Sequence, residues 1–305
     1  ETMNDSYETK AAVLAAKENC SLPIFVTNVY DETSKLMTGA DIGAMVALLE
    51  GLGVDALGLN CSLGPKQMQK LVPEFLRLTS IPLIVTPNAG MPRSVNGNPV
   101  YDVNADEFSD IMAKIAGMGA RILGGCCGTT PEYIKKTVER TKNLPVVPIE
   151  KKSFTVVSSY THAEYIGIKP LLIGERINPT GKPLLKTALR NSDTDFILRE
   201  ALSQQDAGAH ILDVNTGLPE LNEKETLVHT VKEIQSVCDL PLQIDTVDSS
   251  AMAASLRIYN GKPLINSVNG KEESMKSIFP LVKKYGGAVF INYSLKAIYL
   301  PHQEP

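Results

Sequence analysis

The sequence predicts an α/β protein built from two sets of parallel strands in tandem. Nine short apolar strands recur along the 305 residues, and helix-like stretches connect them. A long segment without helical period separates the fourth strand from the fifth. The hydrophobic fraction of 43% is ordinary for a globular enzyme. We therefore expect βα repetition, in which crossover helices join parallel strands.

The strands are predicted from what precedes them and from their apolar character. Four follow a glycine that suits the left-handed end of a helix, in the segments 51–60, 117–125, 206–214 and 285–293. Five follow a proline, in the segments 22–31, 81–90, 169–181, 240–248 and 262–270. Apolar runs of this length suit strands that are buried on both faces, as parallel sheets require. The amphipathic stretch 222–238 is typical of the crossover helices.

The segment between the fourth and fifth strands is interpreted as an interdomain connection. It begins with prolines and shows no helical period over residues 143–169. We place a first domain at residues 1–145, a linker at 146–169 and a second domain at 170–305. In parallel βα folds the functional groups collect where strands run into the following loops, so the candidate sites should lie there.

Charge and cysteine content exclude several classes of protein. The chain has 30 Lys and Arg against 34 Asp and Glu, without a basic run, so we expect no nucleic-acid partner. It has no apolar stretch of about 18 residues and no signal-peptide pattern, so we expect a cytoplasmic protein without membrane contact. Five cysteines, an odd number, argue against a disulfide framework and leave metal binding, catalysis or burial.

Three cysteines stand at the ends of neighbouring predicted strands. Cys61 ends the run ALGLNC, and Cys126 and Cys127 end the run ILGGCC. In a parallel sheet these thiols would converge as three ligands with a fourth position open, which is the layout of a catalytic zinc site. For any one cysteine simple burial is an equal alternative, and we assign Cys20 and Cys238 to structure.

The second half carries carboxylates and amides at its strand ends, without His or Cys. Such a rim would bind a divalent cation or a flat nitrogen heterocycle with alternating donors and acceptors. Capping of helices and turns is the third interpretation for each residue taken singly. The residues are Glu175, Asn178, Asp213, Asn215, Asp245 and Asn266.

Two groups of motifs resemble known families. The segments GLNCSLGP and ILGGCCGTTPEYI resemble the homocysteine S-methyltransferase module, and IGERINPTGK, ILDVNTG, QIDTVDSS and INSVNG resemble the pterin-binding module. Their order resembles that of the cobalamin-dependent methionine synthases. The resemblance implies two (β/α)8 TIM-type barrels in tandem, both incomplete in this chain. The C-terminal half of the first and the N-terminal part of the second would be present.

The resemblance also implies roles for individual residues. Cys61, Cys126 and Cys127 would bind Zn²⁺, and Asn88 and Glu1 would contact homocysteine. The pocket for 5-methyltetrahydrofolate would be lined by the six rim residues, with the most direct contacts to the pterin ring made by two of them, Asp245 and Asn266.

The implied reaction is methyl transfer from 5-methyltetrahydrofolate through cobalamin to zinc-bound homocysteine, giving methionine and tetrahydrofolate. The nucleophile would be the homocysteine thiolate rather than a protein group. No DxHxxG corrinoid signature occurs in the 305 residues, so methylcobalamin would be bound by another domain or protein, and we expect this chain to be inactive alone. The alternatives are a dihydropteroate-synthase-like or folate-binding protein, and a non-catalytic piece that needs a partner chain.

Overall fold

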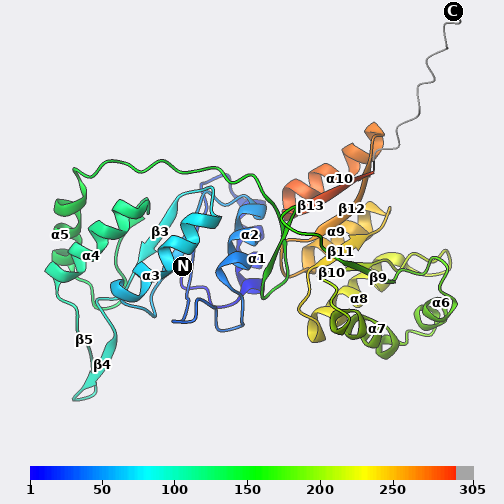
Figure 1. Cartoon of the computed structure of the whole chain (residues 1–305), viewed down its shortest axis with the longest axis horizontal. Coiled ribbons are helices and arrows are strands. Elements are labelled where there is room, and N and C mark those ends of the chain that lie inside the picture. Colours follow the sequence, from blue (N-terminus) through cyan, green and yellow to red (C-terminus); the bar gives the residue numbers. More distant parts are fainter. Residues whose placement is uncertain (293–305) are drawn as a thin grey trace, which may run out of the picture.

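The computed structural model describes residues 1–292 and contains two parallel β-sheets, one in each half of the chain (Figure 1). Within the described residues, each of the nine predicted strand segments contributes a strand to one of these sheets. The mixed α/β class with two parallel sheets is therefore confirmed. Residues 293–305, which we assigned to the second domain, lie outside the described residues.

The first half has a four-stranded sheet with the order β1-β2-β3-β6, and every pair is parallel. Its strands therefore end on one edge, and the loops that follow them lie side by side. Its elements are α1 (Ser6–Asn19), β1 (Phe25–Asn28), α2 (Ile42–Leu52), β2 (Ala56–Asn60), α3 (Pro65–Leu78), β3 (Leu83–Thr86), the hairpin strands β4 (Pro92–Val95) and β5 (Asn98–Tyr101), α4 (Ala105–Met118), β6 (Ile122–Leu123) and α5 (Pro131–Thr141).

The second half has a five-stranded parallel sheet with the order β13-β12-β11-β10-β9. Consecutive strands are again neighbours, so their carboxyl ends share one edge. Its elements are β9 (Ile173–Ile177), α6 (Pro183–Arg190), α7 (Thr194–Asp206), β10 (Ile211–Val214), α8 (Glu223–Val237), β11 (Leu242–Asp245), α9 (Ser249–Ile258), β12 (Leu264–Asn269), α10 (Glu272–Tyr285) and β13 (Ala288–Asn292).

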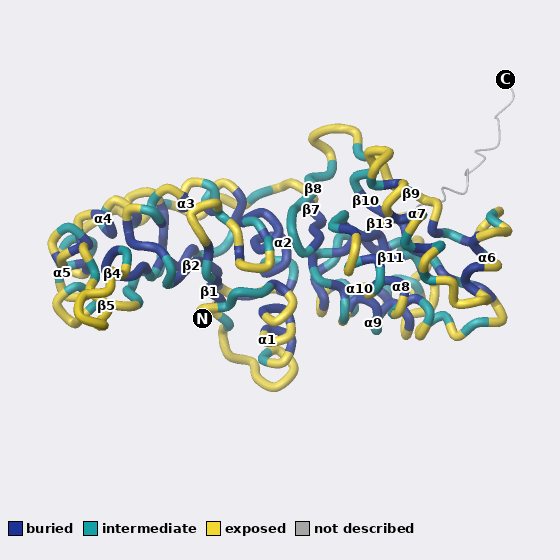
Figure 2. Tube along the Cα trace, turned by 90° about the horizontal axis from the view of Figure 1, so that it is seen from below, coloured by how far each residue is buried: buried dark blue, intermediate teal, exposed yellow. Residues whose placement is uncertain are grey.

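Helix α2 joins the two halves through apolar packing. Its sequence IGAMVALLEGL is apolar on all sides, and nine of its residues are buried. One side packs against α1 and α3, and the other packs against α10 and the hairpin that precedes the second sheet (Figure 2). A helix that is hydrophobic all round needs protein on every face, which here comes from both halves. The largest cluster of buried apolar side chains accordingly includes residues of both sheets.

Polar contacts from α1 add to this junction. The ammonium group of Lys10, only 1% exposed, donates to the carbonyl oxygens of Leu256, at 2.7 Å, and Tyr259, so it caps the C-terminus of α9. Burial lowers the pKa of Lys10 to about 7, and the nearby positive charge of Arg257 acts in the same direction. At the surface Glu18 pairs with Arg257 at 2.6 Å and with Lys284 at 2.9 Å.

The segment 146–169 contains a structure that the sequence analysis did not foresee. Beyond α5 the chain runs back along the first half (Figure 1), where the backbone N–H of Lys152 donates to the Ser80 hydroxyl at 2.8 Å. It then forms an antiparallel hairpin, β7 (Thr155–Ser158) and β8 (Ala163–Ile166), against α2. The segment contains no helix, and the hairpin makes it part of the junction between the two halves.

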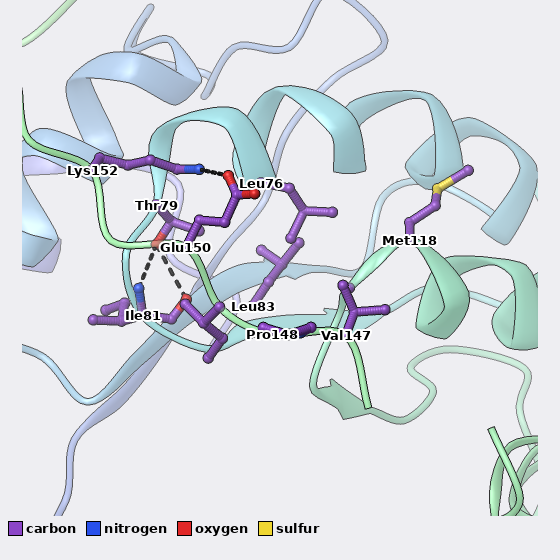
Figure 3. A pocket seen from close by; sticks show the side chains of 11 residues that line it. Leu76, Thr79, Ile81, Leu83, Met118, Val147, Pro148, Glu150 and Lys152 are labelled. Carbon is purple, nitrogen blue, oxygen red and sulfur yellow. Dashed lines mark hydrogen bonds and ion pairs between the residues drawn. The ribbon is translucent and has the colours of Figure 1, made fainter. Parts of the chain in front are cut away.

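The connecting segment also closes one side of a shallow pocket (Figure 3). Val147 and Pro148 face Leu83 and Ile81, and the Glu150 carboxylate pairs with Lys152 at 3.1 Å. Leu83 begins β3, whereas the candidate thiols follow the opposite ends of the strands. This pocket is therefore separate from the candidate site. Among residues 1–292, the helices are all too short or too polar to cross a membrane.

The junction can be tested at a glycine. Gly286 has φ +78°, and a Cβ there would lie 2.2 Å from the carbonyl carbon of Gly51 in the other half. Gly208 also follows a helix with positive φ, +87°, but a Cβ there would meet open space. Both Gly→Ala changes cost roughly 1–2 kcal/mol of backbone strain. We expect Gly286→Ala to lose about 1–3 kcal/mol more, from overpacking.

Urea unfolding of both variants measures this difference. A Gly286→Ala variant no less stable than Gly208→Ala would contradict the close approach of the two halves.

Candidate functional site

Three cysteine side chains converge beside the carboxyl ends of β2 and β6. The sulfur of Cys61 lies 3.8 Å from that of Cys127, which lies 3.9 Å from that of Cys126. Cys61 follows β2 directly and has φ +58°, in the left-handed region that non-glycine residues seldom adopt. This conformation turns the chain sharply at the strand end. Strain of this kind persists where surrounding structure holds it, often at functional sites.

The spacing of the sulfurs fits a metal with tetrahedral geometry. All three lie within 4.8 Å of one another. With Zn–S bonds of about 2.3 Å, two ligands of a tetrahedral site are roughly 3.8 Å apart. Within the part of the chain that the structure describes, these thiols are the one set of three His, Cys, Asp or Glu ligands with such spacing. The donor set and its size therefore suit zinc.

The loop that carries Cys126 and Cys127 is fixed by backbone contacts to the loop after β3. Asn88, 3% exposed, accepts a hydrogen bond from the Cys127 N–H at 3.0 Å. The Ala89 N–H donates to the Cys127 carbonyl at 2.8 Å, and the Cys126 N–H donates to the Pro87 carbonyl at 2.8 Å. These contacts hold the two cysteines relative to β3 without using the thiols.

The surroundings of Cys126 favour its neutral thiol. Burial raises the pKa of Cys126 to about 11, and the neighbouring thiols of Cys61 and Cys127 act in the same direction. A positive metal ion would therefore supply the charge that converts this group to a thiolate.

Glu1, predicted to contact homocysteine, is exposed at the edge of this site. The following residue, Thr2, donates its N–H to the Asn60 side chain at 2.9 Å, and Asn60 directly precedes Cys61. Met3 pairs with Asn28 at the end of β1. Residues 1–3 therefore lie at the same edge of the sheet as the thiols, although no hydrogen bond joins Glu1 to them.

Four of the six rim residues in the second half form one hydrogen-bonded network. The amide of Asn178 donates to Asp213 at 3.3 Å and to Asp245 at 3.2 Å. The amide of Asn215 donates to the same Asp245 oxygen at 3.1 Å. The two other rim residues stand apart from this network. Glu175 pairs with Lys182 at 2.7 Å, and Asn266 is aligned with Asp245 on the neighbouring strand.

Asp213 is the most deeply buried member of the network. It is 2% exposed, and burial raises its pKa to about 6, with the charge of Asp245 as a smaller cause. Hydrogen bonds from Gln243 and Asn178 oppose this shift. Burial also raises the pKa of Asp245. The network therefore keeps two carboxylates close together in a region of low polarity.

Two polar groups of the rim have no partner within residues 1–292. The second carboxylate oxygen of Asp245 and the side chain of Asn266 make no hydrogen bond there. Both residues are partly exposed, and they are register partners on the neighbouring parallel strands β11 and β12. An acceptor beside an amide suits a ligand that presents both a donor and an acceptor along one edge.

Several residues at these sites escaped the sequence analysis. Gln243 donates to Asp213 from the middle of β11, and Thr246 donates to Glu223 across the loops. In the first half, the ring of Tyr101 at the end of β5 lies against Gly128, the residue after Cys127. The pair Asn96-Gly97 is a strong hairpin signal and would have revealed β4 and β5. The other contacts carry no local signal.

Two family models match the chain. Residues 1–141 match the homocysteine S-methyltransferase family, and residues 174–297 match the pterin binding enzymes. The thiol cluster lies in the first of these segments and the carboxylate and amide rim in the second. The chain therefore joins a homocysteine S-methyltransferase module to a pterin-binding module.

Two curated relatives match nearly the whole chain. The methionine synthase of Mycobacterium leprae is 33% identical over 95% of this chain, and that of Mycobacterium tuberculosis is 31% identical over 95%. The chain is therefore similar to methionine synthases over nearly its whole length. It spans 26% and 25% of the length of these relatives, which is about a quarter. Among solved structures, the apo homocysteine methyltransferase MmuM from Escherichia coli is 26% identical with a TM-score of 0.38, covering 46% of this chain and 47% of that one.

The burial of Asp213 predicts a pH-dependent stability. Because the pKa of Asp213 in the folded state is about 6, above the ordinary value of 3.8, the folded state binds the proton more tightly than the unfolded state does. Its contribution to stability is complete below pH 4 and is lost as the pH rises through 6. The Asp213→Asn variant lacks this loss, so it should gain stability relative to wild type from pH 4 to pH 7, by at most about 3 kcal/mol.

Urea unfolding of wild type and variant across this pH range gives the difference directly. The exposed Asp195, changed to Asn, serves as control and should show no comparable trend. If the difference in free energy of unfolding between Asp213→Asn and wild type does not change with pH, the raised pKa of Asp213 is contradicted.

Proposed function

We propose that the chain binds zinc and homocysteine at the thiol cluster and 5-methyltetrahydrofolate at the rim of the second sheet, as part of a methionine synthase reaction. The observation that carries the proposal is the convergence of three sulfurs, 3.8 and 3.9 Å apart along two edges, in a module that matches the homocysteine S-methyltransferases. The similarity to curated methionine synthases, taken together with that match, supports 5-methyltetrahydrofolate as the second substrate.

Cys61, Cys126 and Cys127 would hold Zn²⁺ and leave one position for the homocysteine sulfur. Bound there, zinc would supply the Lewis acidity that keeps the homocysteine sulfur ionised near neutral pH. The side-chain oxygen of Asn88 keeps Cys127 in place by accepting a hydrogen bond from the Cys127 backbone N–H. Asn88 and Glu1 are our candidates for contacts to the amino-acid part of homocysteine. No protein side chain is needed as nucleophile.

In the second half, Asp245 and Asn266 would bind the edge of the pterin ring, since they are register partners on the neighbouring strands β11 and β12. Asn178 and Asn215 hold Asp245 in place through hydrogen bonds, Asp213 accepts from Asn178, and Glu175 lies at the outer part of the rim. Methyl transfer from a tertiary amine requires its nitrogen to gain positive charge. An acidic rim of fixed hydrogen-bonding groups favours that charge.

The methyl group would pass from 5-methyltetrahydrofolate by way of cobalamin to homocysteine, which yields tetrahydrofolate and methionine. We assign none of residues 1–292 to a corrinoid, so cobalamin would come from another domain or protein. We therefore propose that the chain alone binds its two substrates but does not turn them over.

We further propose that the two sheets are incomplete (β/α)8 barrels, assigned to residues 1–145 and 170–305, with 146–169 as the connection. Parallel strands in sequential order, with helices between them, support this assignment. So does the gathering of polar side chains at the carboxyl ends of the strands, where barrel enzymes place their active sites.

Zinc content tests the first site. Wild-type protein purified under reducing conditions should contain about one zinc per chain by elemental analysis. Cys61→Ser and Cys127→Ser should weaken zinc binding by more than the roughly 10–100-fold that loss of an outer contact to a ligand costs. Cys20, exposed at the end of α1, offers the matched control, and Cys20→Ser should bind zinc as wild type does. Equal zinc content in all four proteins would refute the assignment.

Equilibrium binding of 5-methyltetrahydrofolate tests the second site. Because Asp245 and Asn266 offer the free polar groups of the rim, Asp245→Asn and Asn266→Ala should each weaken binding by about 10-fold or more, equivalent to loss of one hydrogen bond of roughly 1.5 kcal/mol. Both variants should keep their zinc. Folate binding that is unchanged in both would remove the second half from the proposal.

A further inference from the structure

A buried glutamine of the second sheet contacts the rim from the inside. Gln243 on β11 and Asp213 on β10 are register partners on neighbouring parallel strands (Figure 1). Their exposed fractions are 6% and 2%. The amide nitrogen of Gln243 donates a hydrogen bond to one carboxylate oxygen of Asp213. Because a buried charge is costly without hydrogen bonds, Gln243 gives Asp213 a donor in place of water.

Further hydrogen bonds extend this contact to the candidate pterin-binding residue Asp245. The second carboxylate oxygen of Asp213 accepts from the amide nitrogen of Asn178 at 3.3 Å, and the same nitrogen donates to Asp245 at 3.2 Å. The amide oxygen of Asn178 accepts from the Thr180 N–H at 3.1 Å, which fixes the direction in which this amide points. A continuous series of hydrogen bonds therefore runs from Gln243 to Asp245.

The series requires Asp213 to accept hydrogen bonds at both of its oxygens. A proton on Asp213 would convert one acceptor into a donor and break a contact. Burial favours that proton and raises the pKa of Asp213 to about 6, and the negative charges of Asp245 and Glu175 act in the same direction. The hydrogen bond from Gln243 opposes them. Gln243 therefore favours the ionised form that the series needs.

The orientation of the Gln243 amide agrees with this role. Its oxygen is buried and has no hydrogen-bond partner within residues 1–292, so its nitrogen makes the polar contact of the side chain. If the amide were turned over, its oxygen would face the Asp213 carboxylate, and two acceptors would repel each other.

We propose that Gln243 is a positioning residue of the pterin site, which acts on Asp245 through the series of hydrogen bonds described above. This inference rests on the proposed function and extends it to a residue that does not touch the substrate. Asn178 and Asn215 donate to one oxygen of Asp245 and leave the other for the ligand. Without Gln243, Asp213 takes up a proton more readily and Asn178 loses an acceptor. Asp245 is then held by Asn215 alone.

Two variants separate hydrogen bonding from packing. Gln243→Met removes the donor and keeps a side chain of similar length, whereas Gln243→Glu donates only when its carboxyl group is protonated. Gln235→Met is the matched control. Gln235 is also partly buried, but it accepts from the Asn260 N–H at 2.7 Å, ahead of β12 and at the opposite end of the sheet from the rim. Circular dichroism checks that each variant is folded as wild type is.

Urea unfolding as a function of pH tests the contact between Gln243 and Asp213 without any ligand. In wild type the contribution of Asp213 to stability is lost as the pH rises through about 6, the pKa of its carboxyl group. Gln243→Met removes a donor to the ionised form, so this loss should extend to a pH about one unit higher. Adding Asp213→Asn should abolish the trend. A pH profile of Gln243→Met that matches wild type would overturn the role of Gln243.

Equilibrium binding of 5-methyltetrahydrofolate at pH 7 tests the action on Asp245. We expect Gln243→Met to weaken binding about 10-fold and Gln235→Met to bind as wild type does. Combined with Asp245→Asn, Gln243→Met should weaken binding by less than about twofold more, because both changes act on the same group. Wild-type affinity of Gln243→Met, or effects that simply add, would overturn the positioning role.

The pH dependence of folate binding separates positioning from packing. Relative to wild type, Gln243→Glu should regain affinity as the pH falls from about 8 to about 6, because its carboxyl group then becomes a donor. A constant ratio of the two affinities would assign Gln243 to packing alone. If wild-type protein binds no 5-methyltetrahydrofolate, the proposed function of the second half fails, and the action on Asp245 fails with it. The urea profile still decides whether Gln243 holds Asp213, because it uses no ligand.

Discussion

The burial of α2 between the two halves is the constraint on which the rest of the structure depends. The helix has no polar face to present to water, and one sheet with its own helices covers only part of it. The hairpin β7–β8 and helix α10 cover the remainder. Because apolar burial is the largest favourable contribution to folding, the two modules are coupled through this helix rather than through their connection alone.

The junction also explains the unusual burial of a charged residue. Lys10 spans from α1 to the end of α9, where unpaired carbonyl oxygens need donors. Its buried position is costly for a positive charge, and two carbonyl partners offset part of that cost. The surface pairs of Glu18 lie beside it and contribute less, since exposed ion pairs are worth little. The close approach of Gly51 to Gly286 and the hydrogen bonds from Lys10 to the end of α9 thus specify one arrangement of the two halves.

Much of the fold followed from the sequence because the signals were local. Glycine or proline before a short apolar run predicted each strand of the two sheets, and the rule for parallel strand ends brought Cys61 to Cys126 and Cys127. The rim of Asn178, Asp213, Asn215 and Asp245 came from the same rule. Glu175, at the outer part of the rim, stays outside this hydrogen-bonded network because it pairs with Lys182.

The missed features depend on residues that are far apart in the chain. Lys10 and Tyr259 are 249 positions apart, so no local pattern announces their contact. The contribution of Asn88 to the site was predicted, but its acceptor role toward the Cys127 backbone depends on how two loops meet. Tyr101 comes to lie against Gly128, next to Cys127, through the β4–β5 hairpin, whose Asn-Gly turn was visible in the sequence but was not used.

The path of the connecting segment has a consequence for the integrity of the molecule. Residues 143–146 are exposed, and they lie between α5 and the first contact of the segment with the rest of the chain. The hairpin β7–β8, which belongs to the later part of the connection, stays packed on α2. A single proteolytic cut in this stretch would therefore leave two pieces that remain associated as a noncovalent complex. Covalent continuity and structural unity are in this sense separate properties of the chain.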